Sequence, residues 1–254
     1  SRTPADIEFP YPSMTGTVVA LAAAAATPGR SVIRGASVEP SCFEQVACLR
    51  AMGAGVSGEL PEVAVEGRAE YPAVDWTTAP DRIHAVTLLV AGLLTRGEVT
   101  VVGGGPLRIP RFVEFLRAVG ARVRDAGSAL TAGFPDRGAL TGVRLRAGSE
   151  PWFSSDWAPF AALLLATRAE GTSQISDDVF LDRFQFAANL EPLGLRGITL
   201  RSGAVGQRRA TFAEIEGRPD AVLRGGDLGR CADIRGSAAL VLAALVADGS
   251  CVLR

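Results

Sequence analysis

Polar and ionisable residues stand directly ahead of four apolar stretches of this sequence. They are Ser13 with Thr15, Asp81 with Arg82, Asp156 alone, and Asp233 with Arg235. Carboxylates can take and give protons, and guanidinium groups bind oxyanions through paired hydrogen bonds. If the four stretches converge in space, these residues predict a site that holds an anionic substrate and moves protons.

The same residues also have simpler interpretations. A serine or aspartate at a helix N-terminus commonly accepts hydrogen bonds from free backbone N–H groups, worth about 0.5–2 kcal/mol. On this view Ser13 and Asp156 are N-caps, and His84 is a solvated residue of a first helical turn. Asp233 and Arg235 would form a surface ion pair worth about 0–1 kcal/mol. The spacing alone leaves both interpretations open.

The elements that carry these residues follow one repeated pattern. Each has a helix that is apolar on nearly every face, then a glycine, then a short strand; the segments are 12–29, 80–97, 154–171 and 232–249. Helices that are apolar all round are buried, and a glycine after a helix suits the left-handed C′ position. The pattern predicts four equivalent buried helices whose polar N-termini lie on one side.

A second, amphipathic helix follows in three of the units and ends in a hydrophobic residue and a glycine, at 43–53, 111–120 and 184–194. The two glycines are 24, 23 and 23 residues apart. A further strand closes each unit, so the repeat is helix, strand, helix, strand over about seventy residues. We expect an α/β protein with central helices and outer sheets.

The repeat is incomplete at both ends. Only one strand follows Gly249, and only twelve residues precede Ser13. We therefore expect a piece of a longer repeat protein, with the missing N- and C-terminal segments of the same protein as its partners.

Composition excludes several classes of function. The chain has 254 residues, 48% of them hydrophobic, and a formal net charge of −1. This length allows one large core or two smaller ones, and the near-neutral charge gives no case for nucleic acid or an anionic membrane as partner. The longest apolar run, 18–26, is shorter than the roughly 20 residues that span a bilayer. We expect a soluble, cytoplasmic protein.

Metal, cofactor and phosphate-loop chemistry is not expected either. The four cysteines form no CxxC pair, and His84 is the single histidine. The thiols are expected to be reduced and mostly buried, without a zinc site or a disulfide framework. The glycine-rich turn at 103–110 lacks the lysine–serine ending of a phosphate loop.

Four stretches carry a resemblance to a known family: 12–40, 79–101, 168–186 and 232–249. In that order they resemble the enolpyruvyl transferases, and most closely the branch that uses UDP-N-acetylglucosamine in peptidoglycan synthesis. The most specific matches are the "VFxxRF" at 179–184 and the "DxR" at 233–235. The resemblance implies an inside-out α/β barrel fold of repeated βαβαββ-type units in two domains. Residues 1–77 would be the last repeat of the first domain, and 78–254 the second domain with an incomplete third repeat.

The resemblance also implies an activity. Family members move the enolpyruvyl group of phosphoenolpyruvate to a sugar hydroxyl and release phosphate. Matched by motif, Asp156 is the general base at that hydroxyl, and Asp233 with Arg235 is the acid/base and phosphoenolpyruvate-contacting pair. The implied substrate-binding residues are Tyr11, Pro12, Ser13, Met14 and Thr15 for the nucleotide, Val179 for a backbone contact to the sugar, and Arg82 and Arg183 in the cleft.

Several departures from the family pattern leave the acceptor open. The family's N-terminal lysine and asparagine, its mobile loop with a catalytic cysteine, and its last arginine have no counterpart here, so none of the cysteines is expected to be catalytic. Tyr11 and Thr15 replace a lysine and a glycine, and Asp156 stands one residue further from Gly171 than in the family. The alternatives are transfer to another nucleotide hydroxyl, as in nucleoside natural-product pathways, or a non-catalytic, degenerate paralogue.

Overall fold

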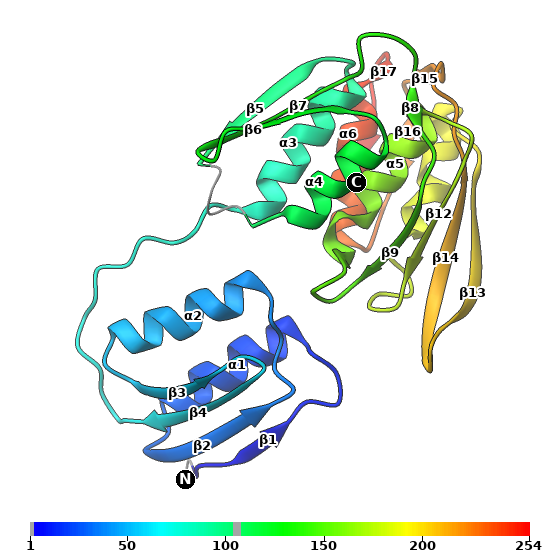
Figure 1. Cartoon of the computed structure of the whole chain (residues 1–254). Helices are drawn as coiled ribbons and strands as arrows, with labels where there is room; N and C mark the ends of the chain where they lie inside the picture. The colour runs from blue at the N-terminus through cyan, green and yellow to red at the C-terminus, as the bar shows by residue number, and fades with distance from the viewer. Residues whose placement is uncertain (1–2, 104–107) are drawn as a thin grey trace. The chain divides into compact units, whose positions relative to one another are not determined.

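The computed structural model describes residues 3–103 and 108–254, and the chain folds into two compact units. The first unit comprises Ser1–Ala79 with Ser149–Pro151, and the second comprises Pro80–Gly148 with Trp152–Arg254. Residues 70–79, at the end of the first unit, contain no helix or strand (Figure 1). Residues 104–107 of the glycine-rich turn predicted at 103–110 fall outside the described residues.

The first unit is a four-stranded sheet with two helices. The strands run in the order β1 (Asp6–Glu8), β2 (Gly29–Arg34), β4 (Glu62–Gly67) and β3 (Gly55–Glu59), and only the β1–β2 pair is parallel. Helix α1 (Met14–Ala25) packs on α2 (Pro40–Ala51), β2 and β4. Leu21, Ile33 and Val65 are fully buried at the centre of this unit.

The second unit begins with a helix and a three-stranded sheet. Its elements are α3 (Arg82–Leu94), β5 (Glu98–Val102), α4 (Pro110–Ala118), β6 (Arg122–Asp125) and β7 (Ala129–Gly133). The sheet is antiparallel in the order β5-β7-β6, and β5 and β7 pack on α3.

A larger sheet and two more central helices complete the second unit. The five-stranded sheet runs β10 (Phe153–Ser154), β9 (Arg144–Gly148), β12 (Thr172–Asp177), β14 (Arg208–Glu216) and β13 (Ile198–Val205). The helical elements are the 3-10 turn η2 (Ser155–Trp157), α5 (Ala158–Arg168), the 3-10 helix η3 (Gln185–Leu193) and α6 (Ile234–Leu245). Three parallel two-stranded pairs join β8 (Leu140–Thr141) to β11 (Ala169–Glu170), β15 (Leu223–Arg224) to β17 (Ala247–Asp248), and β16 (Asp227–Gly229) to β18 (Val252–Leu253).

Helix α5 lies at the centre of the second unit. All of its residues are buried; it contacts α3 and α6 on its flanks, and β12 and β14 pack against it (Figure 1). This confirms the predicted burial of the apolar run 158–168. Each of the other three first helices leaves one face exposed, since Val19, Leu88 and Val241 are 46–60% exposed. The prediction that these helices are buried all round is therefore wrong for α1, α3 and α6.

The glycines after the first helices do not occupy the C′ position. Helices α1, α5 and α6 end three or four residues before Gly29, Gly171 and Gly249. The C′ interpretation does hold for the second helices, where Gly53 and Gly120 follow the C-caps of α2 and α4 with positive φ.

The predicted third amphipathic helix, 184–194, forms the 3-10 helix η3. Pro192 lies inside it. Proline has no N–H to donate to the preceding turn, and its ring clashes with the carbonyl four residues earlier. An α-helix is therefore disfavoured at the end of this segment, which is a nine-residue 3-10 helix instead.

None of the helices within residues 3–103 and 108–254 has the length and apolarity that crossing a membrane needs.

Candidate active site

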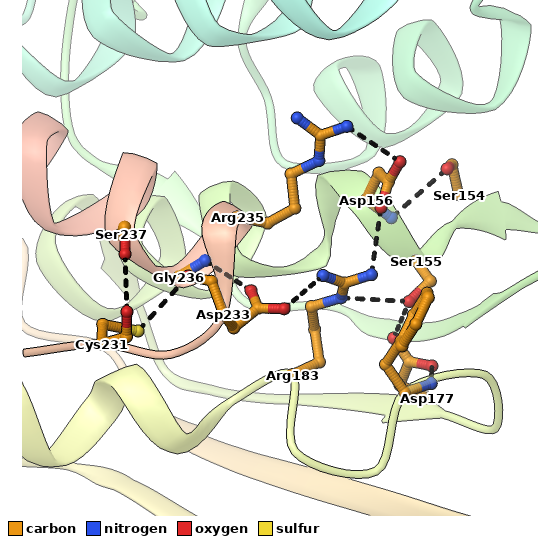
Figure 2. A network of polar contacts seen from close by, with 11 residues as sticks. Ser154, Ser155, Asp156, Asp177, Arg183, Cys231, Asp233, Arg235, Gly236 and Ser237 are labelled. Carbon is orange, nitrogen blue, oxygen red and sulfur yellow. Dashed lines mark hydrogen bonds and ion pairs between the residues drawn. The ribbon is translucent and has the colours of Figure 1, made fainter.

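The carboxylates and arginines predicted to do chemistry meet in the second unit, at the N-terminal ends of α5 and α6. Asp156 lies in η2, the single turn ahead of α5. Asp233 is the N-cap of α6, and Arg235 lies in its first turn. Arg183 comes from the loop between β12 and η3 and lies between the two aspartates (Figure 2).

Asp156 does not cap its helix. Its own N–H donates to Ser154 Oγ at 3.3 Å, and its carboxylate accepts hydrogen bonds from Arg183 and Arg235. No backbone N–H within the described residues donates to that carboxylate. The N-cap interpretation is therefore wrong for Asp156, although it is confirmed for Ser13, which accepts from the N–H of Gly16 at 3.1 Å.

The difference between Ser13 and Asp156 follows from their positions in the repeat. Asp81 and Asp233 each stand sixteen residues before their glycine, and so does Ser155 before Gly171. Asp156 is therefore one position further along, in register with Arg82. Its carboxylate therefore does not cap α5 and binds Arg183 and Arg235 instead.

Arg183 joins the two carboxylates. Its Nη1 lies 2.6 Å from Asp233 Oδ2, and its Nη2 lies 3.0 Å from Asp156 Oδ1. Arg235 Nη2 binds the other oxygen of Asp156 at 3.2 Å. The prediction of a surface ion pair between Asp233 and Arg235 is wrong, because each binds a different partner. Arg183 is only 3% exposed, so its charge is paired inside the protein, as buried charges require.

A second layer of residues stands behind Arg183. Its Nε donates to Ser155 Oγ at 3.4 Å, and the Ser155 hydroxyl donates to Asp177 Oδ2. Asp177 Oδ1 accepts from the N–H groups of Val179 at 2.8 Å and Phe180 at 3.1 Å. Asp177 is fully buried, and burial raises its pKa against the opposing effects of Ser155, the two N–H groups and Arg183.

Sequence reasoning missed Ser155 and Asp177. Two signals were available. Ser155 occupies the register position of the caps in the sibling units, and Asp177 is the last residue of β12, two positions before the "VFxxRF" stretch. Neither signal identifies a partner, because the two residues are 22 positions apart and meet only through folding.

Arg82 also lies near this network. It is the first residue of α3, and its guanidinium stands 5.2 Å from the ring centroid of Trp157, the neighbour of Asp156. Asp81 caps α3 by accepting from the N–H groups of Ile83 and His84. His84 is exposed in the first turn, as predicted.

The predicted nucleotide-binding stretch, Tyr11–Thr15, lies in the first unit. Tyr11 and Pro12 are half-buried ahead of α1, Ser13 caps it, and Met14 and Thr15 are exposed in its first turn. These residues belong to a different unit from the Asp156 network.

The cysteines lie away from these carboxylates, with one exception. Cys231 donates to the backbone carbonyl of Asp233 at 3.4 Å. All four are free thiols, but only Cys42 is buried, so the prediction of mostly buried thiols is wrong for Cys48, Cys231 and Cys251. Burial raises the pKa of the Cys42 thiol to about 11, which keeps it protonated at neutral pH.

Comparison with known proteins places this arrangement in a family. Residues 2–254 match the family of EPSP synthase (3-phosphoshikimate 1-carboxyvinyltransferase). The chain is 35% identical over 245 residues to UDP-N-acetylglucosamine 1-carboxyvinyltransferase 1 of Symbiobacterium thermophilum, and 33% identical over 249 residues to UDP-N-acetylglucosamine 1-carboxyvinyltransferase of Chlorobium limicola. Each alignment covers 96% of this chain and 52% or 54% of the relative. The chain thus spans about half the length of these curated relatives.

A solved structure agrees with the sequence matches. The enolpyruvyl transferase NikO from Streptomyces tendae superposes with a TM-score of 0.79 at 30% identity, covering 99% of this chain and 60% of that one. The family match extends over nearly the whole chain, and the fold agrees over the same range. The chain belongs to the EPSP synthase family of enolpyruvyl transferases.

Proposed function

We propose that the complete protein transfers the enolpyruvyl group of phosphoenolpyruvate to a hydroxyl of a UDP-sugar and releases phosphate. The observation that carries this proposal is the sharing of Arg183 between Asp156 and Asp233, with Arg235 on the outer oxygen of Asp156. The identity to two UDP-N-acetylglucosamine 1-carboxyvinyltransferases supports the choice of acceptor.

Asp156 suits the role of general base at the acceptor hydroxyl. Its side chain is 30% exposed, so a substrate can reach it, while two arginines hold its orientation. A base must lie within hydrogen-bond reach of the proton that it removes, and a carboxylate fixed on both oxygens keeps that geometry. Asp233 binds the other terminal nitrogen of Arg183, and its side chain is 24% exposed. It serves as the second acid/base group.

Arg235 suits the role of anion-binding residue. Its Nη2 binds Asp156, but its buried Nε has no hydrogen-bond partner within residues 3–103 and 108–254. A buried donor without a partner costs about 1–3 kcal/mol. A phosphate or carboxylate oxygen of phosphoenolpyruvate would satisfy this donor, and the N-terminus of α6 adds a favourable dipole.

The chemistry that these residues serve balances in two steps. In the first, the acceptor oxygen bonds to C2 of phosphoenolpyruvate, its proton passes to a base, and C3 gains a proton. In the second, C3 loses a proton, the C2–O bond to phosphate breaks, and the double bond returns. Carboxylates on both sides of a shared guanidinium can take and give the protons of both steps.

Backbone groups and the first unit would hold the acceptor. The N–H of Val179 is bound to Asp177, whereas no group in the described part of the chain donates to its carbonyl. The carbonyl is therefore the atom of Val179 that suits a sugar hydroxyl. Tyr11, Pro12, Ser13, Met14 and Thr15 would contact the nucleotide.

The test is phosphate release by the complete protein from phosphoenolpyruvate, with UDP-N-acetylglucosamine as acceptor. The expected result is release that requires both substrates, with a product heavier by the enolpyruvyl group in mass spectrometry. Absence of release with this acceptor would contradict the proposal. Omission of the acceptor is the control for phosphatase activity.

A second acceptor class has its own support. Tyr11 and Thr15 replace residues of the family pattern at the proposed nucleotide contact, and the structural match to NikO is close. Transfer to a hydroxyl of another nucleotide would fit these departures. The same assay with uridine nucleotides that lack the sugar separates the two, because only this second function predicts release with them.

We infer that the complete protein extends the repeats seen here into two inside-out α/β barrel domains. On this view residues 1–77 are the last repeat of the first domain, and 78–254 begin the second. The central position of α5 between α3 and α6, with sheets outside, supports the inference. The relatives' greater length supports the expectation of further segments.

A further inference from the structure

Asp177 has two oxygens that serve different parts of the site. One oxygen accepts the hydroxyl hydrogen of Ser155, and the other accepts two backbone N–H groups of the loop that carries Val179. The residue is fully buried, so its carboxylate does not itself contact a substrate. A buried carboxylate is unfavourable unless its hydrogen bonds are complete, so its presence here calls for a function beyond packing.

The guanidinium of Arg183 is held on every edge. Its Nε donates to Ser155, its Nη1 to Asp233 and its Nη2 to Asp156 (Figure 2). The centroid of the Phe180 ring lies 4.1 Å from the central carbon of the guanidinium. The group is planar and rigid. Fixing the direction of Nε–H therefore fixes the directions of the other two edges, and with them the positions of both carboxylates.

The Ser155 hydroxyl can fix that direction only if its own hydrogen is committed elsewhere. A hydroxyl rotates freely and can donate or accept. Because Asp177 accepts the hydrogen, a lone pair of Ser155 Oγ is left for Arg183 Nε. Without the carboxylate, the hydroxyl can turn and present its hydrogen to the guanidinium, which is repulsive.

We propose that Asp177, acting through Ser155, is a positioning residue that fixes Arg183 in the orientation that holds Asp156 and Asp233 ready for proton transfer. This rests on the proposed function, because the proton transfers are those of enolpyruvyl transfer. The second oxygen of Asp177 holds the loop of Val179, so the same residue sets the acceptor contact and the base relative to each other.

Steady-state kinetics of Ser155→Ala in the complete protein tests only the contact of Asp177 to Arg183 through Ser155. The change removes the hydroxyl and leaves the Val179 loop on Asp177. The expected result is a kcat lowered about 10- to 100-fold, since small displacements of catalytic groups have effects of this size. The KM values should stay within about threefold, because no substrate contact is lost. Ser155→Thr keeps a hydroxyl and should recover kcat to within about threefold.

Asp178→Asn is the matched control. Asp178 is the neighbouring buried carboxylate, but it pairs with Arg146 and Arg208 rather than with Ser155. It should lower stability and leave kcat unchanged. A fall in kcat as large as that of Ser155→Ala would mean that any buried charge in this loop matters, and the proposal would be wrong.

A spectroscopic measurement on the substrate-free protein separates this proposal from the proposed function. The Nε–H of Arg183 is buried and hydrogen-bonded, so we expect it to exchange slowly; its signal would be assigned by its loss in Arg183→Lys. In Ser155→Ala it should exchange at least about tenfold faster, because its acceptor is gone. Asp178→Asn should leave it unchanged. Unchanged exchange in Ser155→Ala, or faster exchange with an unaltered kcat, would overturn the proposal. If exchange is faster in Ser155→Ala but the wild type has no transferase activity, the result would support the positioning of Arg183 by Ser155 and reject the proposed function.

Discussion

Two carboxylates close together repel, and the arginines of this site determine where each one lies. Arg183 binds Asp156 and Asp233 through separate nitrogens, and Arg235 takes the remaining side of Asp156. A buried charge needs a partner, and the buried Arg183 has two. At the scale of residues, Asp156 is not a helix cap, because its N–H donates to Ser154 and its carboxylate accepts hydrogen bonds from the two arginines.

The first prediction concerns Asp156→Asn in the complete protein. Turnover should fall by at least about 100-fold, because an amide cannot accept the hydroxyl proton. The free energy of unfolding should change little, since the side chain is partly exposed and Arg183 keeps Asp233. Steady-state phosphate release and urea unfolding measure the two effects. Full activity of the variant would show that Asp156 is not the base.

The second prediction concerns pH and Asp177. Burial raises its pKa above the ordinary value of 3.8, so the folded protein binds this proton more tightly than the unfolded chain does. The stability due to this group is therefore fully present below the unfolded pKa and is lost as pH rises through the folded pKa. Asp177→Asn does not titrate. The free energy of unfolding of the wild type minus that of the variant should decrease as pH rises from about 4.

Urea unfolding of both proteins between acidic and neutral pH measures this difference. An increase of the difference with pH would mean that Asp177 is favoured as the charged form in the folded protein. Asp178→Asn controls for the loss of a buried carboxylate from the same loop.

At the scale of elements, the end of β14 lies against the end of α5, and this close approach requires a residue without a Cβ atom. In the second unit Gly217 follows β14, and a Cβ atom there would lie 2.3 Å from the carbonyl oxygen of Ala169, just after α5. The next residue, Arg218, donates its N–H to the carbonyl of Ala166 at 3.0 Å. Gly67 and Arg68 repeat this arrangement at the end of α1 in the first unit.

The third prediction follows from this close approach. Gly217→Ala should lower the free energy of unfolding by about 1–3 kcal/mol, because backbone atoms must move to admit the methyl group. Gly97→Ala is the control in the same unit, since a Cβ there meets its nearest atoms at 3.6 Å, an ordinary contact. Chemical denaturation of both variants gives the comparison. Equal effects would contradict the steric explanation.

At the scale of the whole chain, each unit has its own core. Ile33 belongs to the buried cluster of the first unit, and Leu164 of α5 belongs to that of the second. No residue is shared between these two clusters. A cavity in one should therefore leave the packing of the other intact.

The fourth prediction tests this separation by hydrogen exchange. Ile33→Ala should destabilise the first unit by about 2–5 kcal/mol and speed exchange of its amides. The amides of α5 should keep their protection, and Leu164→Ala should give the reverse pattern. Loss of protection in both units from either change would show that they unfold as one cooperative unit.

Hydrophobic periodicity and glycine spacing predicted several elements of the fold. The apolar run 158–168 predicted a buried helix, and the repeated spacing of glycines predicted where second helices end, because both depend on local patterns. The segment 184–194, predicted as an amphipathic helix, is not an α-helix, because Pro192 disfavours one there. Burial of α1, α3 and α6 was overestimated, since an apolar sequence does not state which neighbours an element has.

The sequence by itself determined which residue types head each helix, and so nominated Asp156, Asp233 and Arg235, whereas Arg183 was nominated by the resemblance of 179–184 to a family motif. The tertiary structure decided the pairing. Arg183 is 27 residues from Asp156 and 50 from Asp233, and Ser155 is 22 from Asp177. Hydrogen bonds act over about 3 Å, whereas chain spacing constrains only near neighbours. The assembly of this network, and the two residues behind it, therefore depended on the packing of α5 against α6.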